Sequence, residues 1–417
     1  MGKVNVAFCI LIISIFLGAC SDEDSGKNNN QDPIRISLSI SELKMVDEGQ
    51  NFAPNLFSVI HELQTNDENI VISPLSLNMA LAMVWNGANG ETKEAIQKAM
   101  GMGNYPQSEV NDYFKKLREA FIKTDPTVKL AIANSIWSKK GFPVKTSFYD
   151  INKNYFNAEV KEVDFSSPNT PNLINKWCSD NTNGLIKEMI KSIPQNAVMY
   201  LLNALYFKGE WSEKFKFEKA ATQNATFKRE NGSSISVKMM NQNSILSYYQ
   251  DEYLSMTSLP FGNKAYSMIF ILPRDIGSFG EMLTRLKEPG YFTKCINLSS
   301  LAEVDLFIPV FKTEYEIVLL ETLRQLGMGI AFSSSADFSG ISDSRLFISN
   351  VLQKCVISVD EKGAEAAAVT MTTYDTAYFP STPPPKAVFR ADRPFLFAIQ
   401  ENSTGVVLFM GKIEKPE

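Results

Sequence analysis

The sequence has almost no histidine: His61 is the only one among 417 residues. A zinc site with two or three His ligands is therefore impossible, and Ser-His-Asp catalysis would have to use this one imidazole. Basic residues are not in excess, because 41 Lys plus Arg stand against 46 Asp plus Glu, whereas nucleic-acid binding needs a concentrated basic face. The chain also lacks a glycine-rich phosphate loop, an HExxH motif and a GxSxG motif. These absences disfavour hydrolases and nucleic-acid-binding proteins.

The apolar run that opens the chain is short. Val4 to Phe16 spans thirteen residues, which is too few for a comfortable transmembrane helix and typical of a signal-peptide core. It leads into Leu17-Gly18-Ala19-Cys20, which resembles the bacterial lipobox, where the cysteine becomes the lipidated first residue. We expect residues 1–19 to be a lipoprotein signal peptide and Cys20 to carry the lipid. The alternative is an ordinary secretory signal beside a chance cysteine.

Polar and acidic residues follow Cys20 directly, beginning with Ser21-Asp22-Glu23-Asp24-Ser25. Residues 20–45 are expected to form a flexible tether. The acidic run resembles the surface-export signal of lipoproteins in the Bacteroides group, and the alternative is a merely solvated linker. The expected location is the outer membrane on the extracellular side, with the periplasmic face as the alternative and the lipid as the sole membrane contact.

Three cysteines remain once Cys9 is removed and Cys20 is lipidated: Cys178, Cys295 and Cys355. Their spacing matches no metal-binding motif, so no metal site is expected. Cys178 and Cys355 lie in otherwise apolar segments. We predict buried free thiols, with one disulfide as the alternative.

The rest of the chain alternates helical and strand patterns without a linker. Apolar spacing predicts helices at 52–63, 75–85, 91–100, 109–123 and 172–181. Ser73-Pro74 is a helix start, and the helix behind it is apolar nearly all round, so it should be deeply buried. Runs rich in β-forming residues predict strands at 129–138, 197–207, 266–272, 304–309, 351–359, 395–400 and 406–412. Length alone suggests two or three domains.

One long segment, Asp360 to Pro385, carries no clear element. A loop of that length in a compact domain is commonly functional. Gly363 to Ala368 are small residues apart from Glu365. In a strand register one face, which could be buried, would carry Ala364, Ala366, Ala368, Thr370 and Thr372, while Glu365 would face water. The segment is therefore a latent strand that ends before the stiff Pro383–Pro385.

Four motifs in order resemble the serpin family of protease inhibitors. They are Asn69-Ile70-Val71-Ile72-Ser73-Pro74-Leu75-Ser76-Leu77, Leu202-Asn203-Ala204-Leu205-Tyr206-Phe207-Lys208-Gly209-Glu210-Trp211, Asp360-Glu361-Lys362-Gly363-Ala364-Glu365-Ala366-Ala367, and the carboxyl-terminal Asp392-Arg393-Pro394-Phe395-Leu396-Phe397 with Leu408-Phe409-Met410-Gly411-Lys412. The resemblance runs from about residue 51 to 415. It implies one α+β domain, assigned to 46–417, with three β-sheets, about nine helices and an exposed reactive centre loop at about 361–387.

The resemblance also implies site residues and a mechanism. A serine protease cuts the loop, and the cut loop inserts into the main sheet as a strand, which stalls deacylation; the chain contributes no catalytic group and needs no cofactor. The partners implied are target serine proteases, and the chain is expected to be a monomer that binds no nucleic acid. The implied hinge is Glu361, Gly363, Ala364, Glu365, Ala366, Ala367 and Ala368, and the implied shutter and breach are Ser73, Ser76, Asn203, Gln353 and Trp211.

The sequence departs from the family pattern twice. Gln353 occupies a shutter position that is commonly histidine, and its amide, which can still donate and accept, is expected to bridge Asn203 and Ser73. Gly363 to Pro394 spans 31 positions, about six more than in a typical inhibitor, which weakens alignment of the loop from its far end. Counting from the hinge therefore locates the reactive bond.

That count gives Ala377-Tyr378 as the reactive bond, and Ala377 suits elastase-like enzymes. Tyr378-Phe379 would suit chymotrypsin-like enzymes, and a bond near Tyr374 is a third option. Papain-like cysteine proteases stay open as targets, whereas trypsin-like ones are disfavoured because no Lys or Arg occurs between Gly363 and Ala377.

Two rival functions remain. One is a non-inhibitory serpin acting as a surface binding module, although its hinge would usually carry bulky, charged or proline residues. The other is a nutrient-binding or nutrient-degrading lipoprotein, which leaves the carboxyl-terminal half unexplained.

Overall fold

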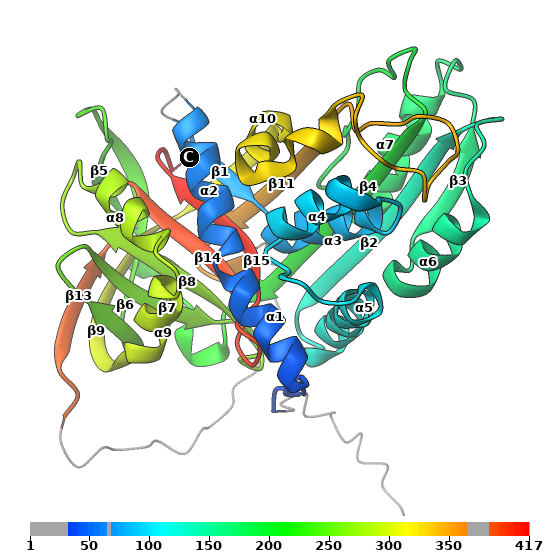
Figure 1. The fold of residues 1–417 in the computed structure, drawn as a ribbon. Coiled ribbons are helices and arrows are strands. Elements are labelled where there is room, and N and C mark those ends of the chain that lie inside the picture. Colours follow the sequence, from blue (N-terminus) through cyan, green and yellow to red (C-terminus); the bar gives the residue numbers. More distant parts are fainter. Residues whose placement is uncertain (1–31, 65–67, 365–382, 417) are drawn as a thin grey trace, which may run out of the picture. The chain divides into compact units, whose positions relative to one another are not determined.

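The computed structural model describes residues 32–64, 68–364 and 383–416. Within these ranges the chain forms ten α-helices and two β-sheets (Figure 1). The helices are α1 (Ile40–Gln50), α2 (Phe52–Leu63), α3 (Pro74–Trp85), α4 (Gly90–Ala99), α5 (Gln107–Thr124), α6 (Thr146–Phe156), α7 (Thr170–Asn181), α8 (Phe279–Leu286), α9 (Tyr291–Leu298) and α10 (Leu320–Leu323). No helix in the described part of the chain is long and apolar enough to span a bilayer.

The first sheet has six strands in the order β10-β11-β12-β4-β2-β3. Its strands are β10 (Phe311–Val318), β11 (Leu352–Val359), β12 (Gly363–Ala364), β4 (Met199–Glu210), β2 (Lys129–Lys139) and β3 (Glu159–Val163). The predicted strands at 129–138, 197–207 and 351–359 are therefore its β2, β4 and β11. The two-residue β12 lies between β11 and β4 in the middle of this sheet.

The second sheet has nine strands, in the order β1-β15-β14-β8-β7-β6-β9-β13 with β5 paired to β6. Its strands are β1 (Ile70–Ile72), β5 (Gln223–Lys228), β6 (Ser234–Gln250), β7 (Leu254–Pro260), β8 (Tyr266–Pro273), β9 (Ser300–Pro309), β13 (Lys386–Arg390), β14 (Phe395–Glu401) and β15 (Val407–Ile413). The expected three sheets are two here because β6 is 17 residues long and pairs with β5, β9 and β7 in turn, which joins two smaller sheets.

Each face of the six-stranded sheet is covered by a separate apolar cluster. Leu205 and Phe207 of β4 belong to the main core with the side chains of α3, which is buried along nearly its whole length as predicted. Leu202 and Ala204 alternate with them and pack in a second cluster with Trp177 of α7. The central strands β2 and β4 are thus covered on both sides, as their continuous apolar runs predict, whereas the edge strand β10 alternates buried and exposed residues.

The three cysteines of the domain are free and buried, which confirms the thiols and excludes the disulfide alternative. They lie on three different elements: Cys178 on α7, Cys295 on α9 and Cys355 on β11. Burial raises the pKa of Cys178 and of Cys355 to about 12, so both thiols stay protonated and unreactive at neutral pH.

His61 packs between two aromatic rings near the end of α2. Its ring stacks on Phe57 with 6.4 Å between centroids and meets Phe279 edge-on at 5.3 Å. Burial, and secondarily the charge of Lys412, lowers the pKa of His61 below its ordinary value of 6.5. The imidazole therefore acts as an aromatic packing group that favours the neutral form.

We predict that His61 makes the fold weaker in acid. Well above pH 6.5 it is neutral in both states, and as the pH falls through 6.5 the unfolded chain takes up the proton before the folded chain does. The free energy of unfolding of the wild type, measured by urea denaturation relative to His61→Phe, should therefore decline between pH 7.5 and the lowered folded pKa. A wild-type minus variant difference that is constant over this interval would contradict the assignment.

Candidate functional site

The hinge residues Gly363 and Ala364 join β4 and β11 at one end, and beyond them a gap separates the two strands. Gly363 is paired with Glu210 of β4, and Ala364 is paired with both Gly209 of β4 and Val359 of β11. Because β12 is antiparallel to both neighbours, β4 and β11 run parallel to each other. Beyond these pairs, no strand within 32–64, 68–364 and 383–416 is paired along the facing edges of β4 and β11.

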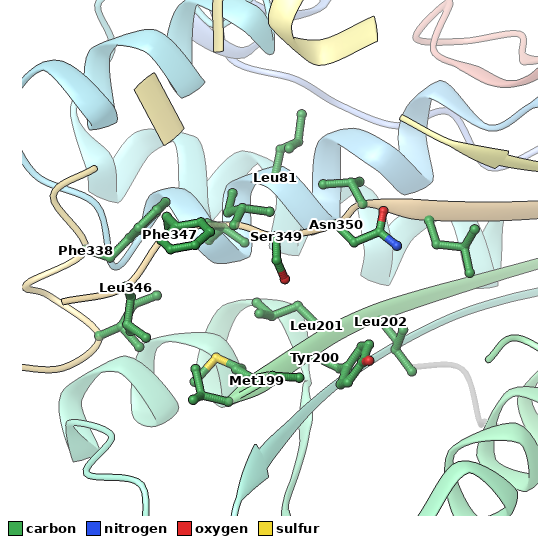
Figure 2. A pocket seen from close by; sticks show the side chains of 18 of the residues that line it. Leu81, Met199, Tyr200, Leu201, Leu202, Phe338, Leu346, Phe347, Ser349 and Asn350 are labelled. Atoms are coloured by element: carbon green, nitrogen blue, oxygen red, sulfur yellow. The ribbon is translucent and has the colours of Figure 1, made fainter. Parts of the chain in front are cut away.

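A cavity of about 330 Å³ opens between the two strands farther from the hinge (Figure 2). One side is the start of β4, where Met199, Tyr200 and Leu201 line it, and the opposite side is the segment that leads into β11, with Leu346 and Phe347. The lining is mainly apolar, although Asn203 and Gln353 close it toward the hinge. The cavity lies where a further strand between β4 and β11 would run.

Trp211 anchors the hinge at the end of β4. Its backbone N–H donates to the carbonyl of Lys362 at 2.8 Å, and its indole N–H donates to the carbonyl of Asp360 at 3.0 Å. The buried indole stacks on Phe261 with 4.6 Å between centroids and 10° between planes. The aromatic pair therefore fixes the backbone from which the loop departs.

The residues before Gly363 form a tight hydrogen-bonded turn. The carboxylate of Asp360 accepts the Lys362 N–H at 2.8 Å, and that of Glu361 accepts the Thr222 hydroxyl at 2.8 Å. Gly363 has φ of +153°, and a Cβ there would lie 2.3 Å from the Gly209 carbonyl oxygen. Only glycine can approach β4 this closely, which gives a physical reason for the small hinge residue.

Polar side chains connect the first turn of α3 to both edges of the gap. On the β11 side, the Gln353 amide accepts the Ser73 N–H at 3.0 Å and donates to the Ser73 carbonyl at 2.9 Å. On the β4 side, the Ser76 hydroxyl donates to the Asn203 amide oxygen. The Ser73 hydroxyl also donates to the Leu408 carbonyl at 2.8 Å and accepts the Ser76 N–H, as a helix cap. The start of α3 therefore spans the gap.

Sequence reasoning named most of this site but misplaced one contact. Ser73, Ser76, Asn203 and Gln353 do gather, whereas the expected bridge from Gln353 to Asn203 is not among the hydrogen bonds of the described residues. Asn203 instead donates to Asn134 of β2 at 2.6 Å. The sequence analysis missed Asn134, Thr222 and Phe261; the available signal for the first was a polar residue inside the apolar run of β2.

Glu361, Gly363, Ala364 and Trp211 form a second group around the hinge. The remaining predicted positions lie outside the described residues: Cys20, Glu365, Ala366, Ala367, Ala368, Ala377 and Tyr378.

Residues 47–416 match the family model for "Serpin (serine protease inhibitor)". The chain belongs to the serpin family, whose members are protease inhibitors rather than enzymes. It is 33% identical to the "Leukocyte elastase inhibitor" of Bos taurus, with 88% of this chain and 97% of that protein aligned. It is 30% identical to a serpin-like protein of Thermococcus kodakarensis, with 98% of each chain aligned.

Solved structures give the same family and fold. The native state of the thermophilic serpin tengpin is similar with a TM-score of 0.80 and 34% identity, covering 92% of this chain and 97% of that one. Human thyroxine-binding globulin, solved in complex with thyroxine, also has a TM-score of 0.80, with 28% identity and coverage of 90% and 99%. The expected α+β serpin fold is therefore confirmed.

We predict that Gln353→Leu destabilises the native protein by about 2 kcal/mol, because the buried Ser73 N–H loses its acceptor. Gln353→His, which keeps one donor and one acceptor, should cost less than half as much. Urea denaturation of the three proteins at pH 7.5 measures both differences. Equal stability of the leucine variant and the wild type would show that the hydrogen bonds between Gln353 and Ser73 do not stabilise the native fold.

Proposed function

We propose that this chain is a serpin-type suicide-substrate inhibitor of serine endopeptidases. The reactive centre loop at about 361–387 is the bait, and after cleavage it inserts between β4 and β11 as a new central strand. The observation that carries the proposal is the pair of parallel strand edges that meet, among the described residues, only at Gly363–Ala364. An antiparallel strand placed between them would satisfy both edges.

The register of β12 can be extended along both neighbours. Ala364 is opposite Gly209 and Val359, so a residue six positions further on, Thr370, would be opposite Asn203 and Gln353. In the same count Ala366 would be opposite Phe207 and Ile357, and Ala368 opposite Leu205 and Cys355. Small side chains on the loop would thus meet large ones on the sheet, which favours insertion without overpacking.

The cavity coincides with the second part of that strand. Its lining runs from Asn203 and Gln353, opposite position 370, past Asn196 and Leu346, opposite position 377, to Arg345, opposite position 378. A strand inserted from 365 to 377 would therefore pass through the cavity. The cut at Ala377-Tyr378 itself rests on the count from the hinge.

Insertion also supplies enough free energy to trap an enzyme. About ten inserted residues with a net gain near 1 kcal/mol per hydrogen bond give on the order of 10 kcal/mol. That is comparable to the whole stability of a typical domain, about 5–15 kcal/mol. The uncut form is therefore metastable and is maintained by kinetics.

The chemistry belongs to the protease. Its serine attacks the carbonyl of the residue before the reactive bond, the new amino terminus leaves, and an acyl-enzyme remains. Insertion would then carry the enzyme along the sheet and distort its triad and oxyanion hole, so that water does not complete the reaction. The inhibitor supplies the bait and the free energy, without a catalytic residue.

The residue composition of the loop supports an elastase-like or chymotrypsin-like target. Ala377 fits a small S1 pocket, and Tyr378, or Tyr374 further upstream, fits a wide apolar one. The similarity to a protein named leukocyte elastase inhibitor supports the first option. Papain-like proteases are a further class of target to include in the assay.

The proposal predicts a complex with pancreatic elastase or chymotrypsin that survives boiling in detergent. Ala364→Arg should convert the inhibitor into a substrate, because Ala364 is already 2% exposed between two strands, and a guanidinium there would expel β12 from the sheet and leave the residues behind it no start for insertion. Ala364→Ser, which is small, should still form the complex.

The mass of the released carboxyl-terminal peptide identifies the bond. Cleavage of the wild type without a stable complex would contradict inhibition and favour a non-inhibitory binding module.

We also propose that the domain is anchored in the outer membrane through Cys20 and faces outward. The described chain begins at residue 32, where a segment packs Ile36 and Leu38 against the core and Ile36 N–H donates to the Ser403 hydroxyl at 3.1 Å. A capping box at Ser39 and Glu42 then starts α1. The first packed residue, Ile36, lies sixteen positions after Cys20, and α1 begins at Ile40. The tether expected at 20–45 is therefore wrong at its far end, because residues 36–45 pack with the domain.

Cys20→Ala should abolish incorporation of radiolabelled palmitate and release the protein from membranes, because the lipid on Cys20 is the proposed membrane anchor. Wild-type cells exposed to protease should lose the protein without lysis if it faces outward. A wild type that takes up no label would show that residues 1–19 are an ordinary secretory signal.

A further inference from the structure

The amino-terminal end of the described chain exposes three large apolar side chains within ten residues. Ile34, Ile40 and Leu43 are 57%, 77% and 51% exposed, and we call them the amino-terminal apolar group. Among the large apolar side chains of the described residues, Ile40 is the most exposed. One exposed apolar side chain is ordinary, whereas several in one short stretch indicate a contact surface.

Two members of the group share the first turn of α1. Ile40 and Leu43 are three positions apart, so they are neighbours on the surface of the helix. Successive residues are turned by about 100° around the axis, which puts both on the side away from the buried Met45 and Val46. The first turn of α1 therefore faces the core with one side and presents apolar side chains on the other.

Charged groups border this turn. Lys44 is exposed and follows Leu43 directly. The carboxylate of Glu42 lies on the other side of the helix, where it pairs with Lys116 of α5 at 2.7 Å. Asp47 shares the exposed side one turn beyond Leu43, so the apolar contact is confined to the first turn of α1 and the segment before it.

The segment before α1 is fixed to the domain. Ile36 and Leu38 pack against the main core, and the Ile36 N–H donates to the Ser403 hydroxyl at 3.1 Å. The Ser39 side chain caps α1. A surface that binds the amino-terminal apolar group would therefore set the orientation of the whole domain.

The chain between this group and the proposed lipid is short. Ile34 lies fourteen positions after Cys20, a distance of at most about 50 Å, and about 20 Å on average for a flexible linker. A lipid on Cys20 would therefore hold the group beside the bilayer at a high effective concentration. The length of this linker, and its end at a lipidated residue, favour lipid as the occupant of the surface.

We propose that the amino-terminal apolar group docks on the bilayer in which Cys20 is anchored. This rests on the lipid anchor proposed above. Ile40 and Leu43 enter the boundary between headgroups and acyl chains, while the exposed Arg35 and Lys44 keep their charges in the headgroup layer. Three side chains are too few to bind a membrane unaided, but they can orient a domain that a lipid already holds there.

The test is quenching of a dye by labelled lipid in the full lipidated protein. A nitrobenzoxadiazole dye is attached to Ser37→Cys, an exposed position inside the segment, because the three native thiols of the domain are buried. The protein is reconstituted through its lipid into phosphatidylcholine vesicles that contain nitroxide-labelled phosphatidylcholine. Adding Ile34→Ser, Ile40→Ser and Leu43→Ser should reduce the quenching at least about threefold, because the lipid alone then leaves the segment free to move away from the bilayer.

A matched control carries the same number of serines at exposed apolar positions elsewhere: Leu173→Ser, Ile276→Ser and Val318→Ser, which are 46%, 46% and 55% exposed. Its quenching should equal that of the protein with only Ser37→Cys.

The possible failures are distinguishable. Quenching that is absent, or that the three serines at 34, 40 and 43 leave unchanged, overturns the docking while the lipid anchor stands. A protein that incorporates no palmitate overturns both. A dimer in sedimentation that the same three serines abolish would also overturn the docking, because it would assign the group to self-association.

Discussion

The rest of the structure depends on two strand edges that are held apart. β4 and β11 run parallel, and in the part of the chain that the structure describes they share only the two residues of β12. Backbone N–H and C=O groups on a buried edge are costly unless they are paired, so the edges favour acceptance of a further strand. Apolar clusters cover both faces of β4, so a further strand can reach its edge only in the gap itself.

Two sets of contacts stabilise the arrangement of β4 and β11 before the loop is cut. Trp211 and the Asp360 turn clamp the hinge at one end. Farther down, the first turn of α3 spans the gap, with Ser73 bonded to Gln353 on β11 and Ser76 bonded to Asn203 on β4. An inserting strand in the extended register would place Thr370 between those two amides. The shutter is therefore the point where the loop must exchange one hydrogen-bond network for another.

Local patterns predicted the elements that carry strong periodicity. The apolar helix after Ser73, the strand at 351–359 and the small-residue hinge all follow from residue spacing, because burial leaves a direct trace in composition. Long-range polar contacts do not. Gln353 was expected to contact both Ser73 and Asn203, and only the contact with Ser73 forms, since that choice depends on where α3 packs. The sequence also carried no sign that β6 joins two sheets. The amino-terminal half of β6 alternates polar and apolar residues, as an ordinary surface strand does.

The central claim is that the uncut domain stores the free energy of strand insertion, and the melting temperature before and after cleavage measures it most directly. A single cut in the loop by a non-target protease should leave both fragments associated and raise the melting temperature by at least about 15 °C, since roughly 10 kcal/mol of pairing becomes available. If the cut protein melts at the same temperature as the intact one, the gap between β4 and β11 accepts no strand, and the account is wrong.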